Sequence, residues 1–234
     1  MDFFSLIMSK KNCSQGNIEQ YIEQGRQAEW SEFWDAYQAN GNLTIYSQAF
    51  YGERWSEKTF KPKYSISPIL AAEMFRNSML NIDLSSLCSE LNINIDFSKC
   101  TNTTYLFYGS RFIRLPEIDL TSVNNISTRE FGEMRSLKTI DKLIIKSDGS
   151  QRFANTFTND DKLENLTIEG TIGQNGFNVQ WCPLTHKSLI SIINALQDKT
   201  GVSGSWTITI GPNNIAKLTP EELKIAENKG WVVV

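Results

Sequence analysis

The stretch that decides the fold reads Phe131-Gly-Glu-Met-Arg-Ser-Leu137-Lys-Thr-Ile140-Asp-Lys-Leu143-Ile-Ile145. It ends in three aliphatic residues with the spacing aliphatic-x-x-aliphatic-x-aliphatic. The last two lie two positions apart, so their side chains face the same side of a β-strand. The gap of three before them lets the chain turn into the strand. The stretch therefore predicts a short strand with one buried face.

The same arrangement returns on both sides of this stretch. Units over residues 106–120 and 157–168 also begin near an aromatic residue and end in spaced aliphatic residues. Phe107 lies 24 residues before Phe131, and Phe157 lies 26 residues after it. A period of about 20–29 residues that contains a short strand is typical of leucine-rich repeats.

Weaker copies of the strand pattern lie at residues 93–97 and 206–210. A strand with one buried face is stable only when neighbouring strands complete its hydrogen bonds and bury a continuous core. We therefore expect an α+β repeat fold, an irregular leucine-rich-repeat solenoid with short strands stacked in one sheet. Two helical inserts, an N-terminal helix and a C-terminal helix-strand cap complete this prediction.

Apolar residues recur with a helical period over residues 15–40, before Gly41. This pattern predicts an amphipathic helix, and its apolar stripe indicates a homo-oligomer that forms through the helix. We expect the chain to divide into an N-terminal segment, 1–40, and the repeat region, 41–234, whose cap is 211–234.

The helical inserts are expected at residues 84–91, after the cap Asp83, and 189–196, after Thr185. The C-terminus carries further helix signals. Thr219, Pro220 and Glu222 have the spacing of a capping box with proline in the first turn, Gly230 ends the helix, and 231–234 follows as a strand.

Composition and charge exclude several classes of protein. The net charge of −3 and the pI of about 5.4 argue against a nucleic-acid partner, which needs a clustered basic face. No apolar run reaches the ~18 residues of a membrane span. The start, Met1 to Met8, has an acidic residue before its apolar run and Lys10 after it, unlike a signal peptide. We expect synthesis in the cytoplasm, with particle association or export by another route left open.

No catalytic, metal or cofactor pattern stands out. His186 is the single histidine, and the start of a predicted helix makes it a surface residue. The four cysteines, Cys13, Cys88, Cys100 and Cys182, form no CxxC pair. The last three lie among apolar residues and are expected to be buried thiols, although a bridge between Cys88 and Cys100 stays open.

The aromatic-anchored, irregular repeats resemble BspA-type bacterial leucine-rich repeats. Four phrases, at residues 30–37, 59–64, 184–194 and 217–231, are similar to those of short repeat proteins encoded in prophages of gut bacteria. The resemblance covers residues 18–234. It implies an extended solenoid with a non-catalytic role in adhesion or phage structure, although the repeats here are less even and carry two helical inserts.

We therefore expect a non-catalytic binding or scaffold protein, phage-associated or acting in cell-surface adhesion, that contacts a protein or glycan surface. The alternative is a glycan hydrolase on a β-solenoid, but no pattern selects two of the 26 acidic residues. The candidate binding residues are the outward strand positions and two aromatic residues that the repeat leaves unexplained: Asp96, Asp119, Ile144, Thr167, Thr209, Trp55 and Tyr108.

Overall fold

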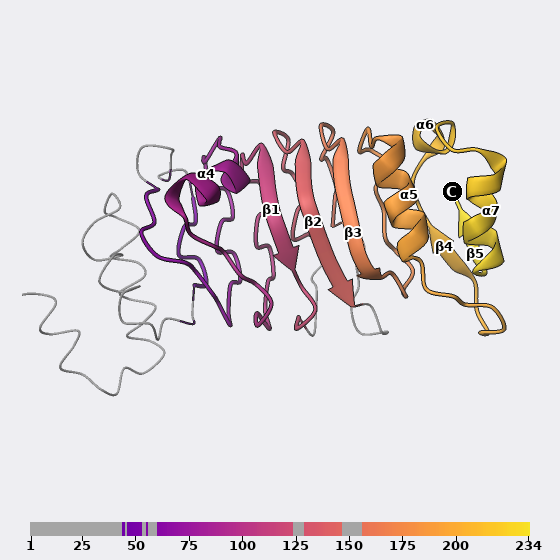
Figure 1. Cartoon of the computed structure of the whole chain (residues 1–234), viewed down its shortest axis with the longest axis horizontal. Helices are drawn as coiled ribbons and strands as arrows, with labels where there is room; N and C mark the ends of the chain where they lie inside the picture. The colour runs from indigo at the N-terminus through magenta and orange to yellow at the C-terminus, as the bar shows by residue number, and fades with distance from the viewer. Residues whose placement is uncertain (1–43, 45, 53–54, 56–59, 124–128, 147–155) are drawn as a thin grey trace, which may run out of the picture.

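The computed structural model describes residues 44, 46–52, 55, 60–123, 129–146 and 156–234, so the predicted helix at 15–40 lies outside it. Within the described part, the elements follow one another along the long axis of the molecule (Figure 1). In chain order they are α4 (Leu84–Leu91), β1 (Arg114–Asp119), β2 (Thr139–Lys146), β3 (Asn165–Thr171), α5 (His186–Ala195), β4 (Trp206–Ile208), α6 (Pro212–Ile215), α7 (Pro220–Asn228) and β5 (Trp231–Val233).

Three parallel strands form the central sheet, in the order β1, β2, β3. The predicted alternation explains them, because each strand buries aliphatic side chains on one face. Ile118 pairs with Leu143, and Leu143 pairs with Ile168. These three side chains are at most 7% exposed. Burial of this shared row therefore fixes the pairing of the strands.

Between two paired buried positions, β3 has one residue fewer than β2. Ile140 and Leu143 of β2 pair with Leu166 and Ile168 of β3, so two residues of β2 lie opposite Thr167 alone. This irregularity is a β-bulge. In the repeat pattern, Leu143 and Leu166 are each the second of three spaced aliphatic residues, which predicts that they pair. This prediction is wrong, because Leu143 pairs with Ile168.

Helix α5, and not a fourth strand, lies beside β3 (Figure 1). The backbone N–H groups of Leu166 and Ile168 donate to the hydroxyls of Ser188 (2.9 Å) and Ser191 (2.8 Å). The same hydroxyls donate to the carbonyl oxygens of Glu164 and Ile168, both at 3.1 Å. The two serines thus satisfy edge groups of β3 that another strand would otherwise pair.

The predicted solenoid sheet is therefore wrong. The central sheet ends at β3, and β4 pairs with β5 in a separate two-stranded parallel sheet. Toward the N-terminus, Ile95 forms an isolated bridge with Ile66, so residues 95–97 add no strand to the central sheet. The described chain has an irregular α+β fold with two small sheets, which corrects the expectation of a leucine-rich-repeat solenoid.

The predicted helix starts are confirmed. Asp83 caps α4 by accepting the N–H of Ser86 at 2.8 Å, and Thr185 caps α5. At α7 the capping box forms as predicted. The Glu222 carboxylate accepts the N–H of Thr219 at 2.8 Å, and the Thr219 hydroxyl accepts the N–H of Glu222 at 3.2 Å.

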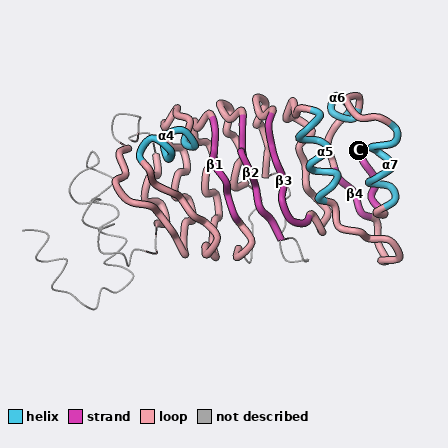
Figure 2. Tube along the Cα trace, in the orientation of Figure 1, coloured by secondary structure: helices cyan, strands magenta, loops and turns pink. Residues whose placement is uncertain are grey.

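A column of buried phenylalanine rings stacks through the core. The ring centroids of Phe75, Phe107, Phe131 and Phe157 follow one another at 5.5, 5.7 and 5.4 Å, with planes within 17° of parallel. The N–H of each of the first three donates to the carbonyl of the residue before the next phenylalanine. Each of these phenylalanines lies in one passage of the chain through the core, and successive passages are adjacent. Much of the chain between the strands is turn and loop (Figure 2), so ring stacking holds the passages together where the sheet does not.

Replacing Phe131 by alanine should destabilise the protein by about 3–5 kcal/mol, because the ring is fully buried between Phe107 and Phe157. Urea unfolding followed by circular dichroism measures the loss. Phe131→Leu, which keeps more of the volume, should lose less, and Thr167→Ala, on an exposed side chain, should lose under about 1 kcal/mol. Equal losses for Phe131→Ala and Thr167→Ala would show that the ring column does not stabilise the core.

Candidate functional site

The turns that follow the stacked rings share one backbone conformation. Two residues after each ring of the column, φ lies between 55° and 69°, at Asn77, Gly109, Glu133 and Asn159. This left-handed conformation turns the chain sharply. The N–H groups of Asn77, Gly109 and Glu133 each donate to a carbonyl oxygen of the next passage, at 2.8–2.9 Å. As a result, the residues after these turns lie side by side.

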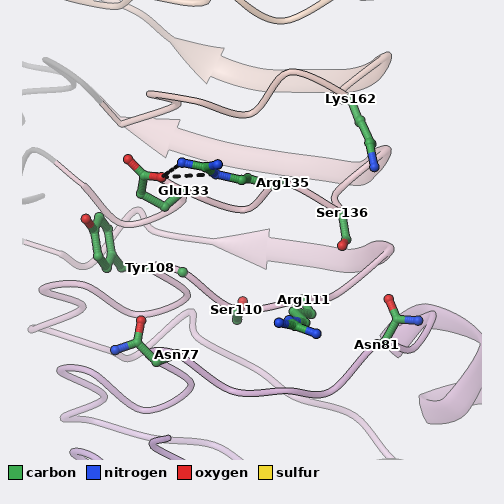
Figure 3. Close-up of a pocket in the computed structure, with 10 residues that line it drawn as sticks. Asn77, Asn81, Tyr108, Ser110, Arg111, Glu133, Arg135, Ser136 and Lys162 are labelled. Carbon is green, nitrogen blue, oxygen red and sulfur yellow. Dashed lines mark hydrogen bonds and ion pairs between the residues drawn. The ribbon is translucent and has the colours of Figure 1, made fainter. Parts of the chain in front are cut away.

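A hollow of about 640 Å³, here called the first hollow, lies over these passages (Figure 3). Apart from one glycine and one tyrosine, its lining side chains are all strongly polar or charged, as expected for a hydroxyl-rich or charged ligand. The lining consists of Asn77, Asn81, Tyr108, Gly109, Ser110, Arg111, Glu133, Arg135, Ser136 and Lys162.

Glu133 is the single carboxylate of the first hollow, and both of its oxygens are engaged. Asn159 Nδ2 donates to Oε1 at 2.6 Å, and Arg135 donates to Oε2 at 3.0 Å. The hydrogen bond from Asn159, with the bond and charge of Arg135, holds the pKa of Glu133 below its ordinary value. Glu133 is therefore a charged anchor that fixes the position of Arg135 (Figure 3).

Arg111 and Lys162 form no ion pair with an acidic residue among the described residues. Both side chains are exposed, and within the described residues neither takes part in an ion pair or side-chain hydrogen bond. With Arg135 they place three cations around one carboxylate in the first hollow. The charge of this site is thus opposite in sign to that of the whole chain, which is −3.

A second hollow, of about 290 Å³, adjoins the first. It is lined by Arg135, Asn159, Asp161 and Trp181, so Arg135 borders both hollows. The Trp181 side chain is 65% exposed. An exposed indole beside charged and amide side chains is a feature of ligand-contacting surfaces rather than of a core.

Apart from Tyr108, the sequence prediction missed the residues that line the two hollows, although the sequence contained a usable signal. Arg111, Arg135, Asp161 and Trp181 each lie four residues after a buried phenylalanine, namely Phe107, Phe131, Phe157 and Phe177. After Phe107, Phe131 and Phe157, this offset places the residue beyond the left-handed turn, where the chain leaves the core. Counting from the aromatic residue, rather than from the strand, would have found these positions.

The predicted strand residues do not gather into one surface. Asp119 and Ile144 are paired neighbours on β1 and β2, but Ile144 pairs on its other side with Glu169, and not with the exposed Thr167. The remaining two lie outside the central sheet: the Asp96 N–H donates to the carbonyl oxygen of Ile66, and Thr209 forms an isolated bridge with Asn178. The Oδ1 atoms of Asp96 and Asp119 accept the N–H two residues later, which is a local turn bond.

The two predicted aromatic residues differ in their outcome. Trp55 is 1% exposed and packs edge-on against Phe50 (5.2 Å) and Phe60 (6.2 Å), so its place among binding residues is wrong. Tyr108 is half-buried and lines the first hollow. The Arg76 guanidinium lies 5.6 Å from the centre of its ring and holds it in place.

Asp160 is a buried carboxyl whose neighbours in the sequence, Asn159 and Asp161, line the second hollow. Its Oδ1 accepts the N–H of Met134 at 2.8 Å, whereas Oδ2 has no partner within the described part of the chain. Burial raises the pKa of Asp160 well above its ordinary value, and the charges of Glu133 and Asp161 add to the rise. The Asp160 side chain thus favours the neutral acid and ties two passages together.

Other chemistry sought from the sequence lies on the surface or in the core. His186 starts α5 and pairs through Nε2 with Glu222, at 2.9 Å. Cys88, Cys100 and Cys182 are buried free thiols, and burial raises the pKa of Cys88 and Cys100 to about 11. Among the described residues there is no group of three or more metal-ligating side chains and no helix long and apolar enough to cross a membrane.

Comparison with known proteins adds no relative. No protein-family model, no curated protein and no solved structure matches the chain. The resemblance to BspA-type repeats therefore stays a prediction from the sequence.

Asp160→Asn should raise the thermal unfolding midpoint at pH 7. The amide mimics the neutral acid and can still accept the Met134 N–H, while the parent must bury a charge or hold a proton. Because the pKa of Asp160 is raised in the folded state, the parent gains stability as the pH falls through that pKa toward 3.8. The advantage of the variant should therefore shrink in acid.

Thermal unfolding followed by circular dichroism over a pH series tests this. Asp161→Asn, at the exposed neighbour, is the control and should change little. A variant at Asp160 that is less stable than the parent at pH 7 would mean that the carboxylate is needed in its charged form.

Proposed function

We propose that the protein is a non-catalytic binding module that holds a carbohydrate in the first hollow. The observation that carries the proposal is the lining of the hollow, in which successive passages of the chain supply amide, hydroxyl and charged side chains to one space. Sugar hydroxyls both donate and accept hydrogen bonds, and such a lining offers partners for both roles.

The aromatic residues at the site support the same ligand class. Tyr108 lines the first hollow and Trp181 lines the second. A ring face of a sugar is apolar and can pack against an aromatic side chain, while its hydroxyls bind the polar groups beside it. A binding module of this kind fits the adhesion role that the resemblance implies, with a cell-surface glycan as the ligand.

Binding without turnover is favoured over glycan hydrolysis by the state of Glu133. Most glycoside hydrolases act with two carboxyl groups that flank the scissile bond. The first hollow offers one carboxylate, and its two oxygens already accept hydrogen bonds from Asn159 and Arg135. Asp161 lines only the second hollow.

The proposal is tested by incubating the protein with an array of neutral and acidic oligosaccharides and measuring both retention and products. We expect retention of at least one glycan with no shorter product in mass spectra. Ser136→Trp should fill the first hollow and weaken retention by about tenfold or more, while Ser203→Trp, on an exposed residue outside both hollows, should not.

Equal thermal unfolding midpoints for the two tryptophan variants would show that Ser136→Trp acts on the ligand and not on the fold. Retention of no glycan by the parent would refute the proposal. Release of shorter glycans, abolished by Glu133→Gln, would favour the hydrolase instead.

A further inference from the structure

We infer that the ligand is an anionic saccharide chain, which crosses the stacked passages from the first hollow toward Trp181. The inference rests on the proposed function and adds the charge, direction and extent of the ligand. It follows from three features of the site: the cations, the spacing of the passages and the position of the exposed indole.

The cations select for negative charge. Arg111 and Lys162 have no acidic partner among the described residues, and Arg135 retains free donors beside its bond to Glu133. A guanidinium binds a carboxylate or sulfate group in a charge-assisted, two-point contact that a neutral sugar cannot make. Since Glu133 is engaged by Asn159 and Arg135, the two uncommitted cations are available to the ligand.

The arrangement of the passages sets the direction in which the saccharide runs. Arg111, Ser136 and Lys162 come from three consecutive passages, and the phenylalanine rings of these passages are 5.7 and 5.4 Å apart. A saccharide that runs across the passages meets a new polar side chain at each step, with a cation at the first and third. A saccharide that runs along a single passage would meet one cation of this row.

The length of the saccharide that the site can hold follows from the position of Trp181. It lies four residues after Phe177, whose ring is 5.8 Å from that of Phe157, so it belongs to the next passage. Arg135 lines both hollows and therefore connects them. The indole is placed to stack on a ring of a saccharide too long to fit in the first hollow alone.

An acidic peptide is the competing anionic ligand, and the lining argues against it. Peptides are usually held through apolar side chains that enter apolar pockets. The first hollow has no aliphatic side chain in its lining, which is polar or charged apart from one glycine and one tyrosine. Asn77, Asn81 and Ser136 have no side-chain partner within the described residues and suit hydroxyl groups. The structure therefore favours an anionic sugar.

Binding is measured by isothermal titration with oligogalacturonates of increasing length, their methyl esters, heparin-derived oligosaccharides and polyglutamate. The methyl ester keeps the sugar backbone and removes the charge. We expect the free acid, the sulfated chain or both to bind about tenfold or more tightly than the ester. The tighter of the two identifies the anionic group.

Two variants locate the contacts. Arg111→Ala combined with Lys162→Ala should weaken binding of the acidic chain about tenfold or more and leave the ester unchanged, while Lys187→Ala combined with Lys224→Ala, on exposed residues of α5 and α7, should change neither. Trp181→Ala should weaken binding of long chains only. All variants should keep the thermal unfolding midpoint of the parent.

The outcomes separate this inference from the proposed function. Equal binding of acid and ester at the first hollow would overturn the anionic preference and leave carbohydrate binding intact. Polyglutamate that binds as tightly as the acidic saccharide would overturn the choice of a sugar. Trp181→Ala with equal effects on short and long chains would overturn the direction. Binding of none of these saccharides would overturn the anionic ligand, while carbohydrate binding itself would be refuted only by retention of no glycan on the array.

Discussion

The stacking of one phenyl ring on the next is the interaction on which the rest of the structure depends. The central sheet holds three strands, yet the passages from Phe75 to Phe157 stay in order because their rings lie 5.4–5.7 Å apart in the core. Each ring also sets the place of the left-handed turn that follows it. The buried rings thereby fix the positions at which the chain turns toward the surface. The surface residues after these turns are therefore spaced in the same way as the rings.

Part of the fold followed directly from the sequence. The alternating aliphatic residues predicted β1, β2 and β3, because burial of one face is a local property of a strand. The end of the sheet could not be predicted in the same way. Ser188 and Ser191 resemble ordinary helix residues until α5 lies against β3 and their hydroxyls replace a strand. The bulge opposite Thr167 is likewise decided by pairing between strands and not within one.

The candidate site was harder to predict than the fold. The outward strand positions were chosen by analogy with a solenoid, whereas the first hollow is built from turn residues, of which Asn77 and Gly109 are of types that favour a left-handed φ. Glu133 adopts a left-handed φ of 63°, which side-chain type alone does not suggest. Trp55 was misplaced because two phenylalanines from its own region, Phe50 and Phe60, enclose it.

Because the surface residue always lies four positions after a buried ring, substitutions in the core and substitutions on the surface fall at different positions of each turn. The buried phenylalanine cannot be exchanged without loss of packing, but the residue four positions later already varies among arginine, aspartate and tryptophan. Substitutions at that position alter charge and shape on the outside while the core keeps its geometry. A chain of this design can acquire a new specificity one turn at a time, at little cost to its folding.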